Sequence, residues 1–378
     1  MNRHRGKTSS KNSKAKEEHS QKEVSNGVES TPTGQDSAKR ASSEHVRKRK
    51  RAIIWSWTWK ICVVNSFLFY LIVPILILCI PDIASQLIFL SYVRCPIFRN
   101  YHDPQTYGLA GARNFYLPST DGVTLGVWQV LPHGVAPENG AGEIPAEFFD
   151  AALGDDRPVV MYCHGNSGSR ANPHRVEVYK VLSNLGYHVI AVDYRGYGDS
   201  SSYTTPEGIH DDVLTVYRWL RAKTGDSPFY LWGHSLGTGI STVFTSKICR
   251  EEECPTGLIL EAPFNNLLDE TMRHPFGLPW NILPYSRLYF DMAFNVTAPH
   301  FQSDKSIPHV TCPILFLHAE DDWIVPFDLG KKLYEVAMDT RPPTAGPVKF
   351  VSFGAEGFGH KNIAFSPKLP PILRDFIK

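Results

Sequence analysis

Polar and apolar residues are distributed unevenly along this chain, and the first abrupt change in pattern lies near residue 51. Residues 1–51 are rich in Ser, Lys, Glu and Gln and contain almost no large apolar side chains. Such a segment cannot bury enough surface to offset the entropy that is lost on ordering. We therefore predict a disordered tail over residues 1–51.

An uncharged apolar run follows at residues 61–81, with the sequence ICVVNSFLFYLIVPILILCIP. Its length matches the roughly 20 residues that a membrane-spanning helix needs. Pro74 lies inside the run, where a helix in lipid tolerates a kink. A cleaved signal peptide would be shorter and closer to the N-terminus. The pattern predicts a transmembrane anchor over residues 52–81, with an interfacial aromatic belt of Trp55, Trp57 and Trp59.

Residues 82–111 form a membrane-proximal segment that contains a second apolar stretch, IASQLIFLSYVRCPIF. Arg94 and flanking prolines interrupt this stretch, so it is too broken to predict a second span. Two interpretations stay open for it. It either lies at the membrane surface or is a buried N-terminal helix of the folded domain that follows.

From residue 112 onward the pattern becomes that of an α/β domain. Two strand-like runs, ARNFYLP and VTLGVWQVLP, flank a turn at Asp121-Gly122 and predict a hairpin. After a loop over residues 132–156, short aliphatic runs alternate with amphipathic helical segments to the end of the chain. This alternation predicts a mostly parallel sheet that is covered by helices on both faces.

The alternation stops between residues 264 and 308, where the sequence is rich in aromatic residues and proline (HPFGLPWNILPYSRLYF). An insertion at this point of a parallel sheet lies over the strand ends, where ligands bind. We therefore predict a lid, and a long surface loop is the alternative.

Charge on either side of the anchor predicts its orientation. Residues 47–51 are RKRKR, whereas only Arg94 and Arg99 lie near the other end. By the positive-inside rule the tail is cytosolic and the folded domain is lumenal or extracellular. An N-glycosylation sequon at Asn295 and a possible disulfide between Cys249 and Cys254 agree with this orientation.

Composition excludes other classes of function. The net charge is +1, and no folded basic motif indicates nucleic-acid binding, so the cluster at residues 47–51 fits anionic lipid better. The seven cysteines show neither C-x-x-C nor zinc-binding spacing. We expect no metal and no cofactor.

The pentapeptide Gly233-His234-Ser235-Leu236-Gly237 lies between a predicted strand and a predicted helix. In that setting the pattern G-x-S-x-G is a nucleophile turn, whose glycines avoid clashes at a sharp bend and leave the serine strained and exposed. Ser235 is therefore the candidate nucleophile. The backbone N–H of Leu236, at the start of the helix, is a candidate donor to an oxyanion.

A serine nucleophile needs a histidine base and an acid, here expected in the chain order Ser, Asp, His. His360 lies in a glycine-rich loop between the last strand and the last helix, which is the position of the base. Asp322 ends the motif H-x-x-x-D after a strand and is the candidate acid. Asp321 and Glu261, which also follow strands, stay open as alternatives for the acid.

A second oxyanion donor is expected from residues 164–168 (HGNSG), with the N–H of Asn166 as the candidate. The glycines at both ends of GNSG allow the backbone to approach a substrate closely. An ordinary polar turn is the alternative. Residues 193–198 (DYRGYG), by contrast, are interpreted as a buried turn that shapes the pocket rather than acting in catalysis.

The motifs HGNSG, DYRGYGDS, GHSLGTG, LILEAPF and HAEDD occur in this order, and residues 112–378 thereby resemble the α/β-hydrolase superfamily. The runs HRVEVYKVLSNLGYHVIAVDYRGYGDS and YLWGHSLGTG, together with the anchor, resemble the lysophosphatidylserine lipase group. The resemblance implies a lipase of the endoplasmic reticulum membrane that cleaves lysophosphatidylserine and monoacylglycerols. It implies Ser235, Asp322 and His360 as the triad. Ala319 stands where many hydrolases have glycine.

An anionic substrate head group would need a cationic partner. The candidates by sequence position are Arg170, Arg175, Arg273 and Lys361. Two other classes of function stay open: a peptidase or acyl-protein thioesterase with the same triad, and a non-catalytic membrane protein that keeps the fold for binding. Nothing in the sequence fixes the oligomeric state.

Overall fold

The computed structural model describes residues 34–80, 86, 88–93, 99–137, 144–251, 254–297 and 301–378. It divides into two compact units, residues 1–66 and residues 67–378. The predicted glycosylation site, Asn295, has a described backbone only, so its side chain lies outside the described part. Residues 1–33 of the predicted tail also lie outside it.

Helix α1 (Gly34–Phe67) begins well before the predicted anchor. For residues 34–51 the structure therefore differs from the predicted disordered tail. Ala, Lys and Arg, which are good helix formers, make up half of this stretch. Glu44 and Lys48 add an ion pair of 3.0 Å one turn apart. Local helix propensity here opposes the disorder that the low apolar content favours.

The helical run continues through η1 (Leu68–Ile72), a π-helical turn, and α2 (Val73–Cys79). Pro74 lies in the first turn of α2 and has no N–H to donate to the preceding turn. The π-helical turn directly before it is a usual way to accommodate such a break. Residues 38–79 are long and apolar enough to cross a membrane, and only 6% of the most apolar stretch is buried by the rest of the chain. The helix therefore fits a single-pass membrane protein and is not a core helix.

In the described residues a single eight-stranded sheet has the strand order β1-β2-β4-β3-β5-β6-β7-β8. Its first two strands form the predicted hairpin, whose turn residues Asp121 and Gly122 have φ values of 59° and 71°. β2 also pairs antiparallel with β4, and the remaining pairs are parallel. The strands are β1 (Ala112–Pro118), β2 (Thr124–Val130), β3 (Val159–Cys163), β4 (His188–Val192), β5 (Phe229–His234), β6 (Gly257–Glu261), β7 (Ile314–Ala319) and β8 (Val348–Phe353).

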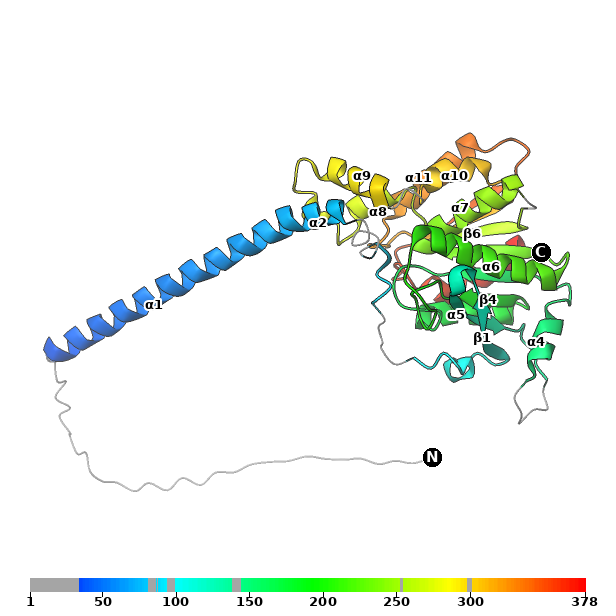
Figure 1. The fold of residues 1–378 in the computed structure, drawn as a ribbon, viewed down its shortest axis with the longest axis horizontal. Helices are drawn as coiled ribbons and strands as arrows, with labels where there is room; N and C mark the ends of the chain where they lie inside the picture. Colours follow the sequence, from blue (N-terminus) through cyan, green and yellow to red (C-terminus); the bar gives the residue numbers. More distant parts are fainter. Residues whose placement is uncertain are drawn as a thin grey trace, which may run out of the picture. The chain divides into compact units, whose positions relative to one another are not determined.

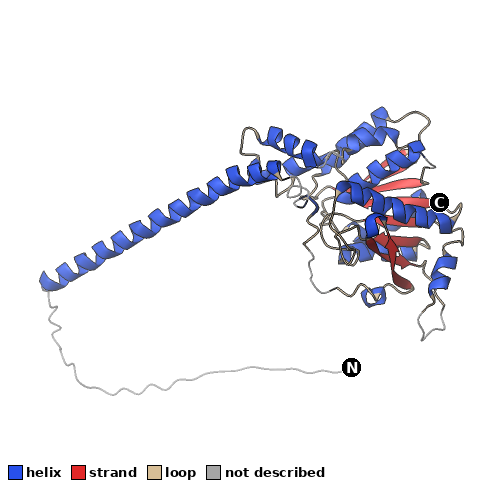
Figure 2. Ribbon diagram, in the orientation of Figure 1, coloured by secondary structure: helices blue, strands red, loops and turns tan. Residues whose placement is uncertain are grey.

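Helices cover both faces of this sheet, as predicted (Figures 1 and 2). The residues of β3 to β7 are buried, which explains their continuous apolar runs. One face packs against α6 (Pro206–Thr224), α7 (Leu236–Glu251) and α11 (Phe327–Thr340). The other packs against α5 (Pro173–Asn184), α12 (Leu369–Phe376) and the short helix η6 (Ile363–Phe365).

The membrane-proximal segment packs against the α/β domain where it is described. Phe89 is fully buried and belongs to the core beneath α6 and α7. Its ring contacts that of Phe301 at 5.9 Å. At Phe89 and Ser91 the structure therefore favours the buried alternative over the membrane surface, whereas Tyr92 and Val93 are exposed. The other short elements outside the insertion are η2 (Pro104–Tyr107), η3 (Thr120–Gly122) and α4 (Ala146–Ala152), of which α4 lies in the predicted loop 132–156.

The predicted lid connects β6 to β7, and in its described residues it is built of short helices rather than one long loop (Figure 1). Asn266 begins the first of these helices by accepting a hydrogen bond from the N–H of Asp269. We call residues 264–308 the insertion. Its helices are α8 (Leu267–Arg273), η4 (Leu278–Trp280), α9 (Ser286–Thr297), α10 (Ser303–Ser306) and η5 (Ile307–His309).

Candidate active site

Ser235 lies in the sharp turn between β5 and α7, with a φ of 54°. Left-handed backbone is costly for a residue other than glycine. The turn is fixed by close packing of its glycines. A methyl group on Gly237 would lie 2.0 Å from the carbonyl oxygen of Cys163, and one on Gly233 would lie 2.3 Å from the hydroxyl of Ser241. The crowding that was expected from G-x-S-x-G is therefore present.

The structure brings Ser235, His360 and Asp322 together from three separate loops. The Oγ of Ser235 lies 3.0 Å from Nε2 of His360. The other ring nitrogen of His360, Nδ1, lies 2.8 Å from Oδ2 of Asp322. All three residues are at most 9% exposed. A continuous hydrogen-bonded chain thus runs from a carboxylate through an imidazole to a hydroxyl in a shielded site.

The Asp322 carboxylate is held on both of its oxygens. Its Oδ1 accepts hydrogen bonds from the backbone N–H groups of Ile324 at 2.9 Å and Val325 at 3.0 Å. Burial raises the pKa of the Asp322 carboxyl, but hydrogen bonds and charges from His318 and His360 outweigh burial and lower this pKa below its usual value. Asp322 is therefore ionised at neutral pH and oriented toward His360.

The two alternative acids have other partners. Asp321 accepts hydrogen bonds at 2.8 Å from the N–H groups of Gly357 and Gly359, and so it organises the loop that carries His360. Glu261 is buried and accepts a hydrogen bond of 2.9 Å from the indole N–H of Trp232. Burial raises the pKa of the Glu261 carboxyl to about 7.

Sequence reasoning missed two supporting histidines. Nε2 of His234 lies 2.9 Å from the carbonyl oxygen of His360. Burial lowers the pKa of His234 well below its usual value, so its ring is neutral when it holds the loop that carries His360. His318 lies 3.4 Å from Oδ2 of Asp322 and 3.0 Å from the carbonyl oxygen of Val325. The signal was available for both: His234 is the variable residue before the serine, and His318 begins the H-x-x-x-D motif.

The loop at residues 164–168 lies beside the nucleophile, since a methyl group on Gly165 would be 3.0 Å from Cβ of Ser235. The Asn166 side chain closes a local turn by accepting the N–H of Ser167, and it donates to the carbonyl oxygen of Ile88 at 2.5 Å. Within the described residues, no hydrogen bond uses the backbone N–H of Leu236 or Asn166. Both predicted oxyanion donors are thus available to a ligand.

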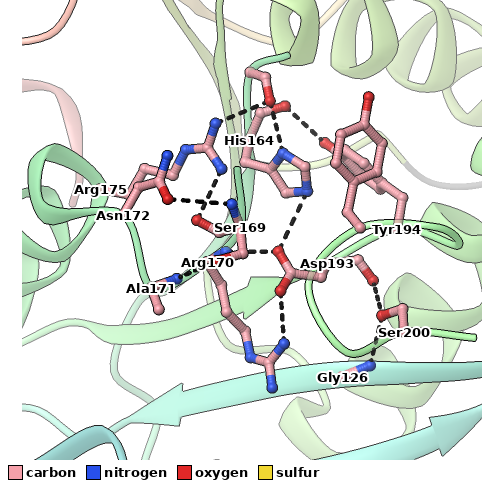
Figure 3. A network of polar contacts seen from close by, with 12 residues as sticks. Gly126, His164, Ser169, Arg170, Ala171, Asn172, Arg175, Asp193, Tyr194 and Ser200 are labelled. Atoms are coloured by element: carbon pink, nitrogen blue, oxygen red, sulfur yellow. Dashed lines mark hydrogen bonds and ion pairs between the residues drawn. The ribbon is translucent and has the colours of Figure 1, made fainter. Parts of the chain in front are cut away.

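Two buried arginines belong to the polar network around this loop (Figure 3). The Arg175 guanidinium donates to the carbonyl oxygens of Gly165 at 3.0 Å and Ser167 at 2.8 Å. Arg170 binds Asp193 through both its backbone N–H and its guanidinium, each at 2.6 Å. These contacts fit the structural role that was expected for residues 193–198.

The same contacts correct one prediction from the sequence. Arg170 and Arg175 are at most 1% exposed, and their terminal guanidinium nitrogens donate to carboxylates and carbonyl groups inside the protein, so neither side chain reaches a substrate head group. Arg273 forms an ion pair with Asp328. Lys361, which follows His360, is exposed and stays a candidate.

The disulfide between Cys249 and Cys254, which the sequence left open, is present. The buried thiol of Cys312 lies close to both of its sulfurs. Because a disulfide occupies two of these three sulfurs, the cluster offers a single thiol and is a poor metal site.

Comparison with known proteins identifies the family of this chain. The family described as "alpha/beta hydrolase fold" matches residues 158–282. The lysophosphatidylserine lipase ABHD12 of Danio rerio is 42% identical over 82% of this chain and 81% of its own length. The Rattus norvegicus protein of the same name is 42% identical over 87% of this chain and 82% of its own length. The human protein ABHD12B is 37% identical over 78% of this chain and 80% of its own length.

Solved structures show the same fold at low sequence identity. An esterase from Pyrococcus furiosus has a TM-score of 0.53 and 18% identity, and the match covers 76% of this chain and 98% of the esterase. An α/β hydrolase from Vibrio vulnificus has a TM-score of 0.55 and 17% identity, covering 78% of this chain and 90% of that protein. These likenesses support the α/β-hydrolase fold.

Proposed function

Because the chain belongs to the ABHD12 family of α/β hydrolases, we propose that it is a membrane-bound serine hydrolase of lysophosphatidylserine and monoacylglycerols. The observation that carries the proposal is the hydrogen-bonded chain from Asp322 through His360 to Ser235. The names of the ABHD12 relatives support the choice of lysophosphatidylserine.

In the first half of the reaction, Ser235 attacks the carbonyl carbon of the acyl ester. Nδ1–H of His360 donates to Asp322, so its Nε2 carries the lone pair that accepts the Ser235 proton. The ionised Asp322 stabilises the imidazolium that forms. The N–H groups of Leu236 and Asn166 bind the oxyanion of the tetrahedral intermediate.

In the second half, the intermediate collapses to an acyl-enzyme on Ser235. His360 gives its proton to the departing glycerol-containing alcohol. It then takes a proton from water, which attacks the acyl carbon, and it returns that proton to Oγ of Ser235 as the bond from the acyl group to Ser235 breaks and the fatty acid leaves. No step of this mechanism requires a metal or a cofactor.

Location in the endoplasmic reticulum membrane with a lumenal catalytic domain is part of the proposal. The basic residues 47–51 before the apolar helix support a cytosolic N-terminus. The disulfide between Cys249 and Cys254 supports an oxidising compartment for the hydrolase domain. Glycosylation of Asn295 stays a prediction of the same orientation.

Recognition of the serine head group is proposed for Lys361, the exposed cation next to His360. Lys361→Gln removes the charge while keeping side-chain length and polarity. We expect this change to reduce turnover of lysophosphatidylserine more than turnover of monoacylglycerol. Equal losses on both substrates, measured as fatty acid release, would refute head-group selection by Lys361.

The proposal is tested by labelling membranes that contain the full chain with a fluorophosphonate probe, with Ser235→Ala as the matched variant. We expect labelling of the wild-type protein that the substitution abolishes and that lysophosphatidylserine competes away. Absence of labelling would favour a non-catalytic binding protein. Labelling that is indifferent to the lysolipid would favour a peptidase or thioesterase.

A further inference from the structure

The insertion exposes several large apolar side chains that lie close together in the sequence. Phe276 is 74% exposed, Ile282 70% and Leu288 63%. Solvent-exposed apolar residues in such a cluster mark a surface that contacts an apolar partner. Among the described side chains of the insertion, the exposed large apolar ones are Phe276, Leu278, Ile282, Tyr285, Leu288 and Met292.

Sequence pattern and helix geometry give this surface an amphipathic character. No Asp, Glu, Lys or Arg occurs between Arg273 and Arg287. Within α9, Leu288 and Met292 are four residues apart and therefore share one face of the helix. Arg287 and Asp291, also four apart, form an exposed polar stripe beside it. An apolar stripe next to a charged stripe is typical of a helix that lies in a membrane interface.

Contacts with the apolar helix place the insertion next to lipid. The ring of Trp280 stacks on that of Phe69 at 4.5 Å and contacts that of Tyr70 at 5.6 Å. Phe69 precedes the helix end at Cys79 by ten residues, which is about 15 Å of helix at 1.5 Å per residue. That length is about half of the ~30 Å hydrocarbon core of a bilayer. Trp280 thus packs on a part of the helix that lipid surrounds.

A second constraint comes from the short connection after the helix. Phe89, which is buried in the hydrolase core against Phe301 of the insertion, follows Cys79 by ten positions. Even a fully extended chain of that length spans at most about 35 Å. The insertion is therefore tethered close to the membrane surface through chain connectivity as well as through ring contacts.

We propose that the exposed apolar face of the insertion enters the bilayer that holds the chain's own helix. This face contacts the acyl chains of the leaflet next to the hydrolase domain. Arg287 and Asp291 then lie at the level of the lipid head groups. The predicted glycan on Asn295, three residues after Met292, would keep that end of α9 in water. The proposal builds on the proposed function because it gives a single-chain lipid a route from the leaflet to Ser235.

Photolabelling from within the bilayer tests this proposal without relying on catalysis. The full chain is reconstituted in phosphatidylcholine vesicles with an apolar aryl diazirine that partitions into lipid, irradiated, and mapped by mass spectrometry. Peptides from residues 61–79 serve as the internal positive control. We expect label on Phe276, Ile282 or Leu288 as well. Label on residues 61–79 without label on the insertion would overturn the proposal.

Charged substitutions in α9 show whether the photolabelling depends on its apolar stripe. Leu288→Asp with Met292→Asp should reduce label on the insertion roughly tenfold or more, because burial of one such side chain shifts an equilibrium by about that factor. Met338→Asp is the matched control, since Met338 is 55% exposed on α11, outside the insertion. Label that is unchanged in the double variant would contradict lipid contact by this stripe.

Two further readouts separate the possible outcomes. Retained fluorophosphonate labelling of Ser235 in detergent shows that the double variant is folded. If the stripe instead joined two copies of the chain, chemical crosslinking would give a dimer that the double variant loses, and the bilayer proposal would be wrong. If the insertion is photolabelled but Ser235 never reacts, the proposed function fails and the membrane contact stands.

Discussion

Replacing Asp322 with asparagine tests the direction of every hydrogen bond in the candidate triad. In the wild-type protein Oδ1 accepts two backbone N–H groups, from Ile324 and Val325, and Oδ2 accepts Nδ1–H of His360. An asparagine keeps the two backbone donors satisfied only if its oxygen faces them, so its NH₂ group then faces His360. Reversing the amide would leave both backbone donors opposite an NH₂ group, at about 0.5–1.5 kcal/mol for each lost bond.

An NH₂ group facing Nδ1 forces His360 into the other tautomer, with a proton on Nε2 pointing at Ser235. Nε2 of His360 is then already protonated before the reaction begins and cannot accept the proton of Ser235. For such a tautomer reversal we expect kcat to fall by about 10⁴, the order seen in another serine hydrolase triad. This factor corresponds to about 5 kcal/mol of transition-state stabilisation. The assay is steady-state hydrolysis of a soluble short-chain ester by the purified full chain in detergent.

Asp321→Asn is the matched control on the neighbouring residue. Its carboxylate only accepts the N–H groups of Gly357 and Gly359, so the substitution costs one hydrogen bond in the base loop. We expect kcat to fall by no more than about tenfold. Activity of Asp322→Asn within tenfold of wild type, or an equal collapse in Asp321→Asn, would refute the assignment of the acid.

Three more substitutions test the surroundings of the site. Gly237→Ala places a methyl group 2.0 Å from the carbonyl oxygen of Cys163. We therefore expect the free energy of unfolding to fall by about 1–3 kcal/mol, measured as a lower melting temperature. An unchanged melting temperature would contradict this close packing. Tyr197→Phe removes a hydroxyl that donates to the carbonyl oxygen of Phe89 at 2.5 Å and lies 3.4 Å from Oδ1 of Asn166. We expect kcat to fall by about twofold to tenfold at constant KM, and a change confined to KM would argue against oxyanion-loop positioning. Glu261 has a pKa raised to about 7 from near 4.5, so its contribution to stability is complete below about pH 4.5 and is lost as pH rises to about 7. Glu261→Gln should therefore remove that part of the pH dependence in chemical denaturation, and parallel stability curves for both proteins would contradict the shift.

Local sequence patterns predicted the fold well because each depends on short-range geometry. The hairpin followed from Asp121-Gly122, and the sheet followed from aliphatic runs that are buried on both faces. The start of the long helix was not predicted, because hydropathy identifies only the apolar run at residues 61–81. Residues 34–51 depend instead on helix propensity and on the Glu44–Lys48 pair.

Long-range contacts limited what could be inferred about the site. Ser235, His360 and Asp322 were identified because each lies in a motif at a strand end. Arg170 and Arg175 were candidates for substrate contact because sequence position does not reveal burial, and both are enclosed by carbonyl groups and carboxylates. The contact of Asn166 with Ile88 joins segments that are 78 residues apart and has no local signature.

The most direct test of the central proposal is release of fatty acid from lysophosphatidylserine by the full chain in vesicles, with Ser235→Ala beside it. We predict turnover by the wild-type protein and a loss of several orders of magnitude in the variant. No release by a wild-type protein whose Ser235 reacts with fluorophosphonate, or equal release by both proteins, would contradict the account.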